Sequence, residues 1–361
     1  MRKQILATGF VVFSFMLPLK ATAASFTGIY TFGDSLSDPG NVFNTTSGNI
    51  PTAPYSEGRF SNGPIWVEEL ADSLGLNPTL VTTPGTNSQE GINFAYGGAT
   101  TGQDNTISQI PGFPFPPLPG LEQQIQTFIQ TLPKEDPNTL PQADAKALYI
   151  LWAGANDYLP TQSTFTPFQT PTKPIQNIST AVTSLFDVGA RNIMVLNLPD
   201  LGNNPLVLGL NQQFPGLSFQ LNALTEAHNT QLAQTLDVLS ESLTGINLIS
   251  VDVNSLFDEA LAGKLGFTKP STPCLADPEC VIDQTGNLQK QFLFWDRIHP
   301  TTTAHKLIGE LAFKTLEDNQ KSIPEPDAEF GLLALAALGT GSLLKRQLAK
   351  ASTVRGMRDE G

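Results

Sequence analysis

The sequence has few residues that carry charge, bind metals or form disulfides. Only 15% of its 361 residues are Asp, Glu, Lys or Arg, against about 25% in an average soluble protein. Acidic residues outnumber basic ones by 33 to 20, so the formal net charge is −13. This balance argues against nucleic acid as a partner, because phosphate binding needs a basic surface. Two cysteines and three histidines exclude a disulfide-stapled miniprotein and leave little for a metal cluster.

The chain is well supplied with apolar residues, at 40%, and has 30 glycines and 28 prolines. A chain of this length can bury a sizeable core. The low charge, combined with many Pro, Thr, Asn and Gln residues, predicts a neutral polar surface of the kind that exported proteins carry.

Residues 1–24 are typical of a signal peptide. Arg2 and Lys3 precede the mostly apolar residues 5–19, and the small-x-small site Ala21-Thr22-Ala23 follows. This order of charge, apolar run and cleavage site favours a signal peptide over a buried first helix. We therefore predict that the protein is exported to the periplasm, the cell surface or the medium.

The other end of the chain contains a second apolar segment. Residues 323–326 (Ile-Pro-Glu-Pro) precede an uncharged run, residues 330–344, and Lys345-Arg346 follow at once. As a helix this run would span roughly 22 Å, short of a hydrocarbon core of about 30 Å. The arrangement resembles the PEP-CTERM sorting signal of exported bacterial proteins, although Asp327, Glu329 and the long tail depart from it. It implies transient contact with a membrane or a sorting enzyme; the alternative is an amphipathic or core helix.

Cys274 and Cys280 lie close together in one short segment. In an exported protein such a pair most simply forms a local disulfide. A metal site is less favoured, because no histidine or further cysteine stands nearby to complete a ligand shell. We assign the pair no functional role.

Short apolar runs alternate with helical patterns between the two ends. The continuous apolar runs predict a parallel sheet covered by helices on both faces, in one domain. Ligands of such sheets bind at the carboxyl ends of the strands. The predicted strands are residues 29–32, 147–152, 193–196 and 246–251, and the predicted helices are residues 64–74, 175–188, 217–243 and 303–316.

Two long stretches, residues 103–120 and 158–174, are rich in Pro, Phe and Gly or Thr. Loops of this length are often lids or pocket walls, and a plain surface excursion is the alternative. Four aromatic side chains in them either line a site for an acyl group or pin their loops: Phe113, Phe115, Phe165 and Phe168.

The first predicted strand ends in residues 33–41, Gly-Asp-Ser-Leu-Ser-Asp-Pro-Gly-Asn. A serine on a tight turn after a buried strand, here Ser35, is well placed to be a nucleophile. Its own backbone N–H can also point at a bound carbonyl group.

A serine nucleophile needs a base, and the chain offers three histidines. His228 lies on the apolar stripe of a long helix and is expected to be a packed helix residue, and His305 is expected on a helix surface. His299 instead stands in a loop, three residues after Asp296. An Asp at this spacing can fix the imidazole tautomer and leave the other nitrogen free to accept the serine proton. Taken alone, Asp296 is better explained as a helix-capping or loop carboxylate.

Two further segments follow predicted strands and contain hydrogen-bond donors. Residues 93–100 offer the unhindered backbone N–H of Gly98, and residues 154–157 offer the side-chain amide of Asn156. Acyl transfer needs such donors around the developing oxyanion. Singly, each segment is also explained as a glycine turn with an Asn or Asp cap.

Together the four segments resemble the GDSL-type lipases and esterases, also called SGNH hydrolases, most closely their secreted lipase and phospholipase branch. The resemblance implies an α/β fold, a three-layer α/β/α sandwich with a flavodoxin-like parallel sheet. It implies that Ser35 is the nucleophile, His299 the base and Asp296 its orienting partner. Ser35, Gly98 and Asn156 would form the oxyanion hole, and no metal or organic cofactor is required.

We therefore expect a serine ester hydrolase that acts through an acyl-enzyme on a small-molecule or lipid ester. The expected organisation is a signal peptide at residues 1–24, one hydrolase domain at residues 25–320 and a sorting tail at residues 321–361. Two alternatives stay open. One is a polysaccharide O-acetyl esterase or acyltransferase on the same fold, and the other is an inert cell-surface binding protein.

Overall fold

The computed structural model describes residues 26–84, 90–133, 141–283 and 285–322. The predicted signal peptide lies outside these ranges, and so does the predicted sorting tail from residue 323 onward. Within the described ranges, no helix combines the length and the apolar character that a membrane crossing needs.

A central sheet of six parallel strands forms the middle layer, in the order β2-β3-β1-β4-β5-β6. Apart from the short edge strand β2, this is the flavodoxin-like order, with β1 at the point where the strand order reverses. The prediction of a flavodoxin-like parallel sheet is confirmed. The strands are β1 (Ile29–Gly33), β2 (Thr79–Leu80), β3 (Gly91–Asn93), β4 (Leu148–Trp152), β5 (Asn192–Leu196) and β6 (Asn247–Val251).

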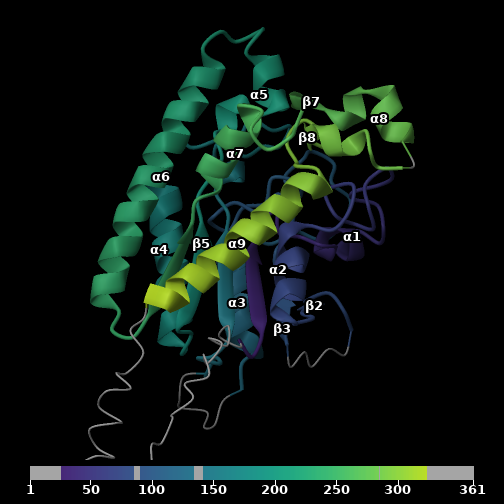
Figure 1. Cartoon of the computed structure of the whole chain (residues 1–361). Helices are drawn as coiled ribbons and strands as arrows, with labels where there is room; N and C mark the ends of the chain where they lie inside the picture. Colours follow the sequence, from purple (N-terminus) through teal and green to yellow (C-terminus); the bar gives the residue numbers. More distant parts are fainter. Residues whose placement is uncertain (1–25, 85–89, 134–140, 284, 323–361) are drawn as a thin grey trace, which may run out of the picture.

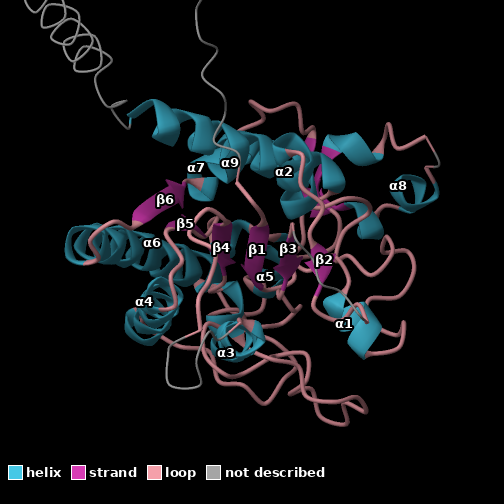
Figure 2. Cartoon of the chain, turned by 90° about the horizontal axis from the view of Figure 1, so that it is seen from below, coloured by secondary structure: helices cyan, strands magenta, loops and turns pink. Residues whose placement is uncertain are grey.

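Helices cover both faces of the sheet, as a three-layer sandwich requires (Figure 2). Helices α2, α7 and α9 lie on one face, and α3, α4 and α6 lie on the other. The former are α2 (Trp66–Leu74), α7 (Val253–Leu261) and α9 (Thr302–Ser322); the latter are α3 (Leu121–Thr131), α4 (Thr172–Asp187) and α6 (Leu217–Ser242).

The side chains of β4 show how this layering follows from the sequence. All five of its residues are apolar and buried, and successive side chains point to opposite faces. Ile150 and Trp152 pack into the core beneath α2 and α9, whereas Tyr149 and Leu151 pack into the core beneath α3, α4 and α6. A strand that must fill two cores can have no polar face, and this explains its unbroken apolar run.

The structure contains short elements that the sequence pattern did not predict. Helix α3 was missed, although Leu121, Ile125 and Phe128 recur at helical spacing and are buried. Its polar residues are mostly glutamines, which blur the contrast between its two faces. The remaining elements are α1 (Asn41–Thr45), α5 (Pro205–Leu210), α8 (Pro278–Ile282), the strand pair β7 (Lys269–Pro273) and β8 (Phe292–Phe294), and the short 3-10 helices Ala155–Asp157, Leu201–Asn203, Cys274–Ala276 and Gln289–Gln291.

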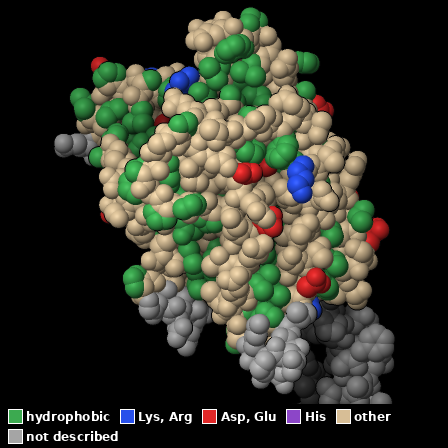
Figure 3. All heavy atoms as spheres, turned by 180° about the vertical axis from the view of Figure 1, so that it is seen from behind, with side chains coloured by type: hydrophobic (Ala, Val, Ile, Leu, Met, Phe, Trp, Pro, Cys, Tyr) green, Lys and Arg blue, Asp and Glu red, His purple; other side chains and the backbone are tan. Residues whose placement is uncertain are grey.

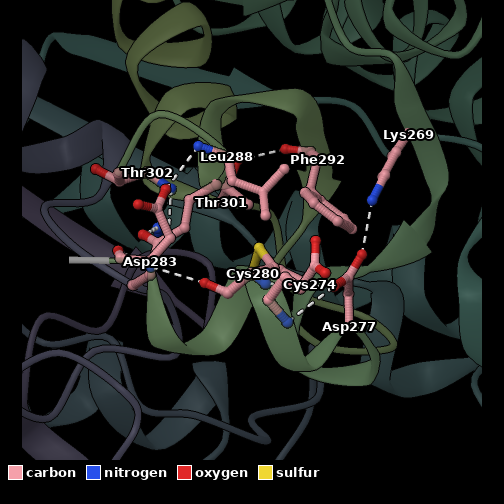
Figure 4. Close-up of a disulfide and its surroundings, with 12 residues drawn as sticks. Lys269, Cys274, Asp277, Cys280, Asp283, Leu288, Phe292, Thr301 and Thr302 are labelled. Carbon is pink, nitrogen blue, oxygen red and sulfur yellow. Dashed lines mark hydrogen bonds and ion pairs between the residues drawn. A yellow bond between two sulfur atoms is a disulfide. The ribbon is translucent and has the colours of Figure 1, made fainter. Parts of the chain in front are cut away.

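The predicted local disulfide is present between Cys274 and Cys280 (Figure 4). Both cysteines are buried in a small cluster with Phe292 and Trp295. Lys269 forms an ion pair with Asp277 at 2.6 Å beside them. The disulfide thus fixes the segment that packs against the end of β8.

The surface agrees with the low charge of the sequence. On the face seen from behind, acidic and basic side chains are scattered among neutral polar and apolar ones (Figure 3). Helices α5 and α7 and the strands β7 and β8 gather at the upper end of the molecule (Figure 1).

A buried glutamine ties α3 to the end of β1. The side-chain oxygen of Gln124 accepts from the N–H of Gly33, and its amide group donates to the Gly33 carbonyl, both at 2.9 Å. This pair of hydrogen bonds replaces a neighbouring strand where β1 leaves the sheet. Gln124 thereby fixes the backbone two residues before Ser35.

We expect Gln124→Leu to lower the free energy of unfolding by about 2–3 kcal/mol, because the buried N–H of Gly33 loses its acceptor. Urea unfolding followed by circular dichroism measures this change. Gln130→Leu is the matched control, since it makes the same replacement at an exposed position of the same helix. Equal stabilities of the two variants would contradict the prediction.

Candidate active site

Ser35 lies on a turn directly after β1. The Asp34 carboxylate accepts from the N–H of Leu36 at 3.0 Å, and the N–H of Ser37 donates to the Asp34 carbonyl at 3.1 Å. These two bonds close the turn around Ser35. Its side chain faces a cavity at the carboxyl end of the sheet, where a ligand of this fold is expected.

A hairpin-like turn after β8 presents Asp296 and His299. The N–H of Trp295 donates to the His299 carbonyl at 2.7 Å, and the N–H of Thr301 donates to the Leu293 carbonyl at 2.9 Å. Because β8 and the start of α9 are both packed into cores, the turn between them is held rigidly.

The structure joins Ser35, His299 and Asp296 by hydrogen bonds. Ser35 Oγ lies 2.8 Å from His299 Nε2, and His299 Nδ1 lies 2.6 Å from Asp296 Oδ2. Asp296 Oδ1 accepts from the backbone N–H groups of Ile298, at 2.7 Å, and His299, at 2.6 Å. Asp296 is therefore both a loop carboxylate and the partner of the imidazole, so the two interpretations of this residue are compatible.

The charges around His299 perturb its titration. Burial lowers the pKa of His299, but the charge and hydrogen bond of Asp296, assisted by the charge of Asp34, raise it above its ordinary value. Burial also raises the pKa of Asp296, yet the His299 ring and two backbone N–H groups outweigh this and hold the pKa at about 2. The carboxylate thus stays ionised and stabilises the protonated imidazole.

Gly98 and Asn156 lie on the same cavity as Ser35. Gly98 has a φ of +78°, and a Cβ there would approach Asn105 Oδ1 to 2.8 Å, so glycine is required. Within the described chain, the backbone N–H groups of Ser35 and Gly98 have no protein acceptor. The Asn156 amide donates one N–H to the Ala99 carbonyl at 3.0 Å and retains a second. Three donors are thus available to an oxygen atom in the cavity.

Two buried carboxylates hold these donors in place. Asp38 accepts from the N–H groups of Gly97 at 2.9 Å and Gly40 at 2.8 Å, which links the loops that follow β1 and β3. Asp157 accepts from the N–H and hydroxyl of Thr101, at 2.9 and 2.7 Å, which links the loops that follow β3 and β4. Burial raises the pKa of Asp38 to about 6 and that of Asp157 to about 7.

The cavity is mainly apolar and has a volume of about 210 Å³. Ser35, Gly98, Asn156 and His299 line it, while Asp296 contacts the side of the imidazole that faces away from Ser35. Asp34 and Asp200 are the carboxylates on its wall. The apolar lining includes Phe60, Ile107, Ile110, Leu159, Leu201, Phe257, Leu261, Phe294 and Ile298.

One of the two expectations about the neighbouring histidines needs correction. His305 is buried rather than on a helix surface, and its Nδ1 accepts from the Trp66 N–H at 3.4 Å, because α9 packs closely against α2. His228 is packed as expected, with its Nδ1 2.7 Å from the Tyr158 hydroxyl. Neither histidine lines the cavity described above.

The four loop phenylalanines pin their loops and do not line the cavity. Phe113 pairs with Phe115, and Phe165 pairs with Phe168, each in an edge-to-face contact. Residues 103–120 nevertheless supply a pocket wall, through Thr106, Ile107 and Ile110 among others, as one of the two interpretations proposed.

Sequence reasoning missed two aromatic residues at the site. The Tyr55 hydroxyl donates to Asp296 Oδ2 at 2.7 Å, and the Phe60 ring lies 5.2 Å from the His299 ring. No motif singled them out, since more than two hundred residues separate them from their partners. Among the residues that the structure describes, no group of three or more His, Cys, Asp or Glu side chains is arranged to hold a metal ion.

Comparison with known proteins agrees with this geometry. A phosphatidylcholine-sterol acyltransferase of Aeromonas hydrophila is 27% identical, over 81% of this chain and 91% of that protein. Two GDSL esterase/lipases of Arabidopsis thaliana are 26% and 28% identical, over 79% of this chain in both cases and 81% and 84% of theirs.

The family model described as GDSL-like lipase/acylhydrolase matches residues 29–312, well over half of the chain. The protein therefore belongs to the GDSL-like lipase/acylhydrolase family and is a carboxylic ester hydrolase.

Proposed function

We propose that Ser35, His299 and Asp296 form the catalytic triad of a lipase or esterase that acts through an acyl-enzyme. The observation that carries this proposal is the unbroken chain of hydrogen bonds from Ser35 Oγ through the imidazole to Asp296. Its serine end lies in an apolar cavity beside free hydrogen-bond donors.

The geometry supports a double displacement. His299 Nε2 accepts the proton of Ser35 Oγ as the oxygen attacks the ester carbonyl carbon. The carbonyl oxygen, now negative, accepts from the N–H groups of Ser35, Gly98 and Asn156. The imidazolium then protonates the departing alcohol, and water, activated by the same imidazole, hydrolyses the acyl-enzyme.

The lining of the cavity supports an ester with an extended acyl chain. Phe257, Leu261 and Leu201 offer apolar surface that an acetyl group would leave largely uncovered. The names of the relatives refer to esterase, lipase and sterol acyltransferase activities. A lipid or other long-chain ester therefore fits the cavity better than an acetylated polysaccharide.

We also propose that the protein works outside the cytoplasm. The disulfide between Cys274 and Cys280 supports this, because such bonds persist mainly in oxidising compartments. Membrane or sorting-enzyme contact through the C-terminal tail remains part of the proposal.

The first test is hydrolysis of p-nitrophenyl esters by the full chain. We expect Ser35→Ala to lower kcat/KM by roughly 10⁴- to 10⁶-fold, because it removes the hydroxyl that is hydrogen-bonded to the His299 base. Ser73→Ala, which removes a hydroxyl bonded to the Glu69 carbonyl on α2, is the control and should retain full activity. Substantial activity in Ser35→Ala would exclude this mechanism.

The second test is the pH dependence of kcat/KM. The base must be neutral, so activity should fall as pH drops through the His299 pKa, which is raised above its ordinary value. Asp296→Asn should lower kcat/KM by about 10²- to 10⁴-fold. In this variant the fall of the residual kcat/KM at acidic pH should also occur at lower pH, because the negative charge that stabilises the imidazolium is gone. Asp187→Asn, at an exposed position of α4, is the control, and an unmoved limb would argue against Asp296 as the partner.

The third test measures the acyl-chain preference. We expect kcat/KM to be higher for octanoate and longer esters than for acetate. Leu261→Trp, which fills part of the cavity, should lower kcat/KM for the long esters by about tenfold while changing acetate hydrolysis much less. Acetate serves as the internal control, and equal losses on both esters would place the acyl chain elsewhere.

A further inference from the structure

One oxygen of Asp296 accepts hydrogen bonds from two side chains. Asp296 Oδ2 lies 2.6 Å from His299 Nδ1 and 2.7 Å from the Tyr55 hydroxyl. The other oxygen, Oδ1, is anchored by the backbone N–H groups of Ile298 and His299. Tyr55 therefore contributes to the charge distribution of the carboxylate more than to its placement.

Tyr55 begins a segment, residues 55–62, that we call the clamp segment. Its Phe60 ring contacts the His299 ring, and its Ser61 hydroxyl donates to the Pro300 carbonyl at 2.9 Å. Asn62 Oδ1 accepts from the Thr302 N–H at 2.8 Å. The clamp segment thus contacts the turn of Asp296 and His299 along its length. These contacts hold the clamp segment in place independently of the Tyr55 hydroxyl.

The Tyr55 hydroxyl is a donor to Asp296 throughout the working pH range. Burial, and next the negative charge of Asp296, raise the pKa of Tyr55 above its ordinary value. The phenol therefore keeps its proton, and because Asp296 is ionised the proton points at the carboxylate.

We propose that Tyr55 is a positioning residue of the triad that shares Asp296 Oδ2 with the imidazole and so weakens the hold of Asp296 on the imidazolium form of His299. This inference rests on the proposed triad. Its consequence is that more of His299 is in the neutral, basic form near neutral pH.

Among the other groups that face His299 in the described chain, none opposes the effect of Asp296 on its protonation at neutral pH. Asp34, from the turn after β1, acts in the same direction as Asp296 and favours the imidazolium. His305, from α9, interacts electrostatically with His299, but burial lowers its pKa to about 3 and it is uncharged at neutral pH. Without the Tyr55 donor, the two carboxylates, Asp296 and Asp34, would stabilise the imidazolium more strongly. His299 would then lose its proton, and the enzyme would become active, only at higher pH.

The test compares Tyr55→Phe with Tyr149→Phe in the full chain. Tyr149 is the matched control, because its hydroxyl also donates a partly buried hydrogen bond, to the Asp144 carbonyl at 2.9 Å, but the residue lies on β4. The readout is NMR titration of the imidazole Cε1–H signals with ¹³C-labelled histidine. The chain has three histidines, and the pKa values of His228 and His305 are lowered to about 4 and about 3, so the imidazole signal that titrates near neutral pH belongs to His299.

We expect the midpoint for His299 to rise by roughly half a pH unit or more in Tyr55→Phe. It should stay at the wild-type value in Tyr149→Phe. An unchanged or lowered midpoint in Tyr55→Phe would overturn the proposal, since the hydroxyl would then have only a structural role. An equal change of the His299 midpoint in both variants would also overturn the proposal.

Kinetics provide the second readout. The acid limb of kcat/KM should move to higher pH in Tyr55→Phe, with a loss of about threefold or more near pH 6.5 and little loss on the alkaline plateau. An equal loss at every pH would again indicate a structural role. The NMR titration needs no turnover, so a wild-type protein without esterase activity would refute the proposed function while the Tyr55 inference was still decided.

Discussion

The carboxyl end of β1 lies between those of β3 and β4, and the site depends on this arrangement. The three loops that leave these strands contain Ser35, Gly98 and Asn156 respectively. Each hydrogen-bond donor is a backbone N–H or the amide of a short side chain, so its position is set by where the preceding strand ends. Parallel strands joined in register by hydrogen bonds fix those ends relative to one another, and the reversal of strand order at β1 opens the crevice between them. Of the five residues proposed for the triad and the oxyanion hole, Asp296 and His299 come from outside these three loops.

Four carboxylates are buried around this crevice, and what surrounds each one decides its charge. Asp34, Asp38 and Asp157 accept hydrogen bonds, and Asp34 also interacts with the charge of His299, but burial dominates and raises the pKa of each. Asp296 is buried too, but the imidazole lies against it and its pKa falls to about 2. Asp296 therefore stays ionised, and it is placed where an imidazolium forms.

The parts of the site that the sequence predicted are those whose chemistry is local. Ser35, Gly98 and Asn156 stand in short segments directly after strands, and the spacing of Asp296 and His299 is itself short. The continuous apolar run of β4 similarly predicted a strand buried on both faces. Contacts between distant segments left no such signal. Tyr55 acts through one hydrogen bond and Gln124 through two, in each case to a residue far away in the chain, and His305 is buried because α9 lies against α2.

The apolar wall and the free donors of the cavity act together. A buried N–H group without an acceptor costs about 1–3 kcal/mol, and the N–H groups of Ser35 and Gly98 lie at a cavity where a bound oxygen atom can be that acceptor. In the proposed reaction, an acyl chain that covers Phe257 and Leu261 excludes water from the cavity. The donors then have the carbonyl oxygen as their acceptor, in a medium where charge is poorly screened, so their attraction for the developing oxyanion is strongest when the chain is bound. In that reaction, apolar contact remote from the ester bond would be converted into stabilisation of the transition state.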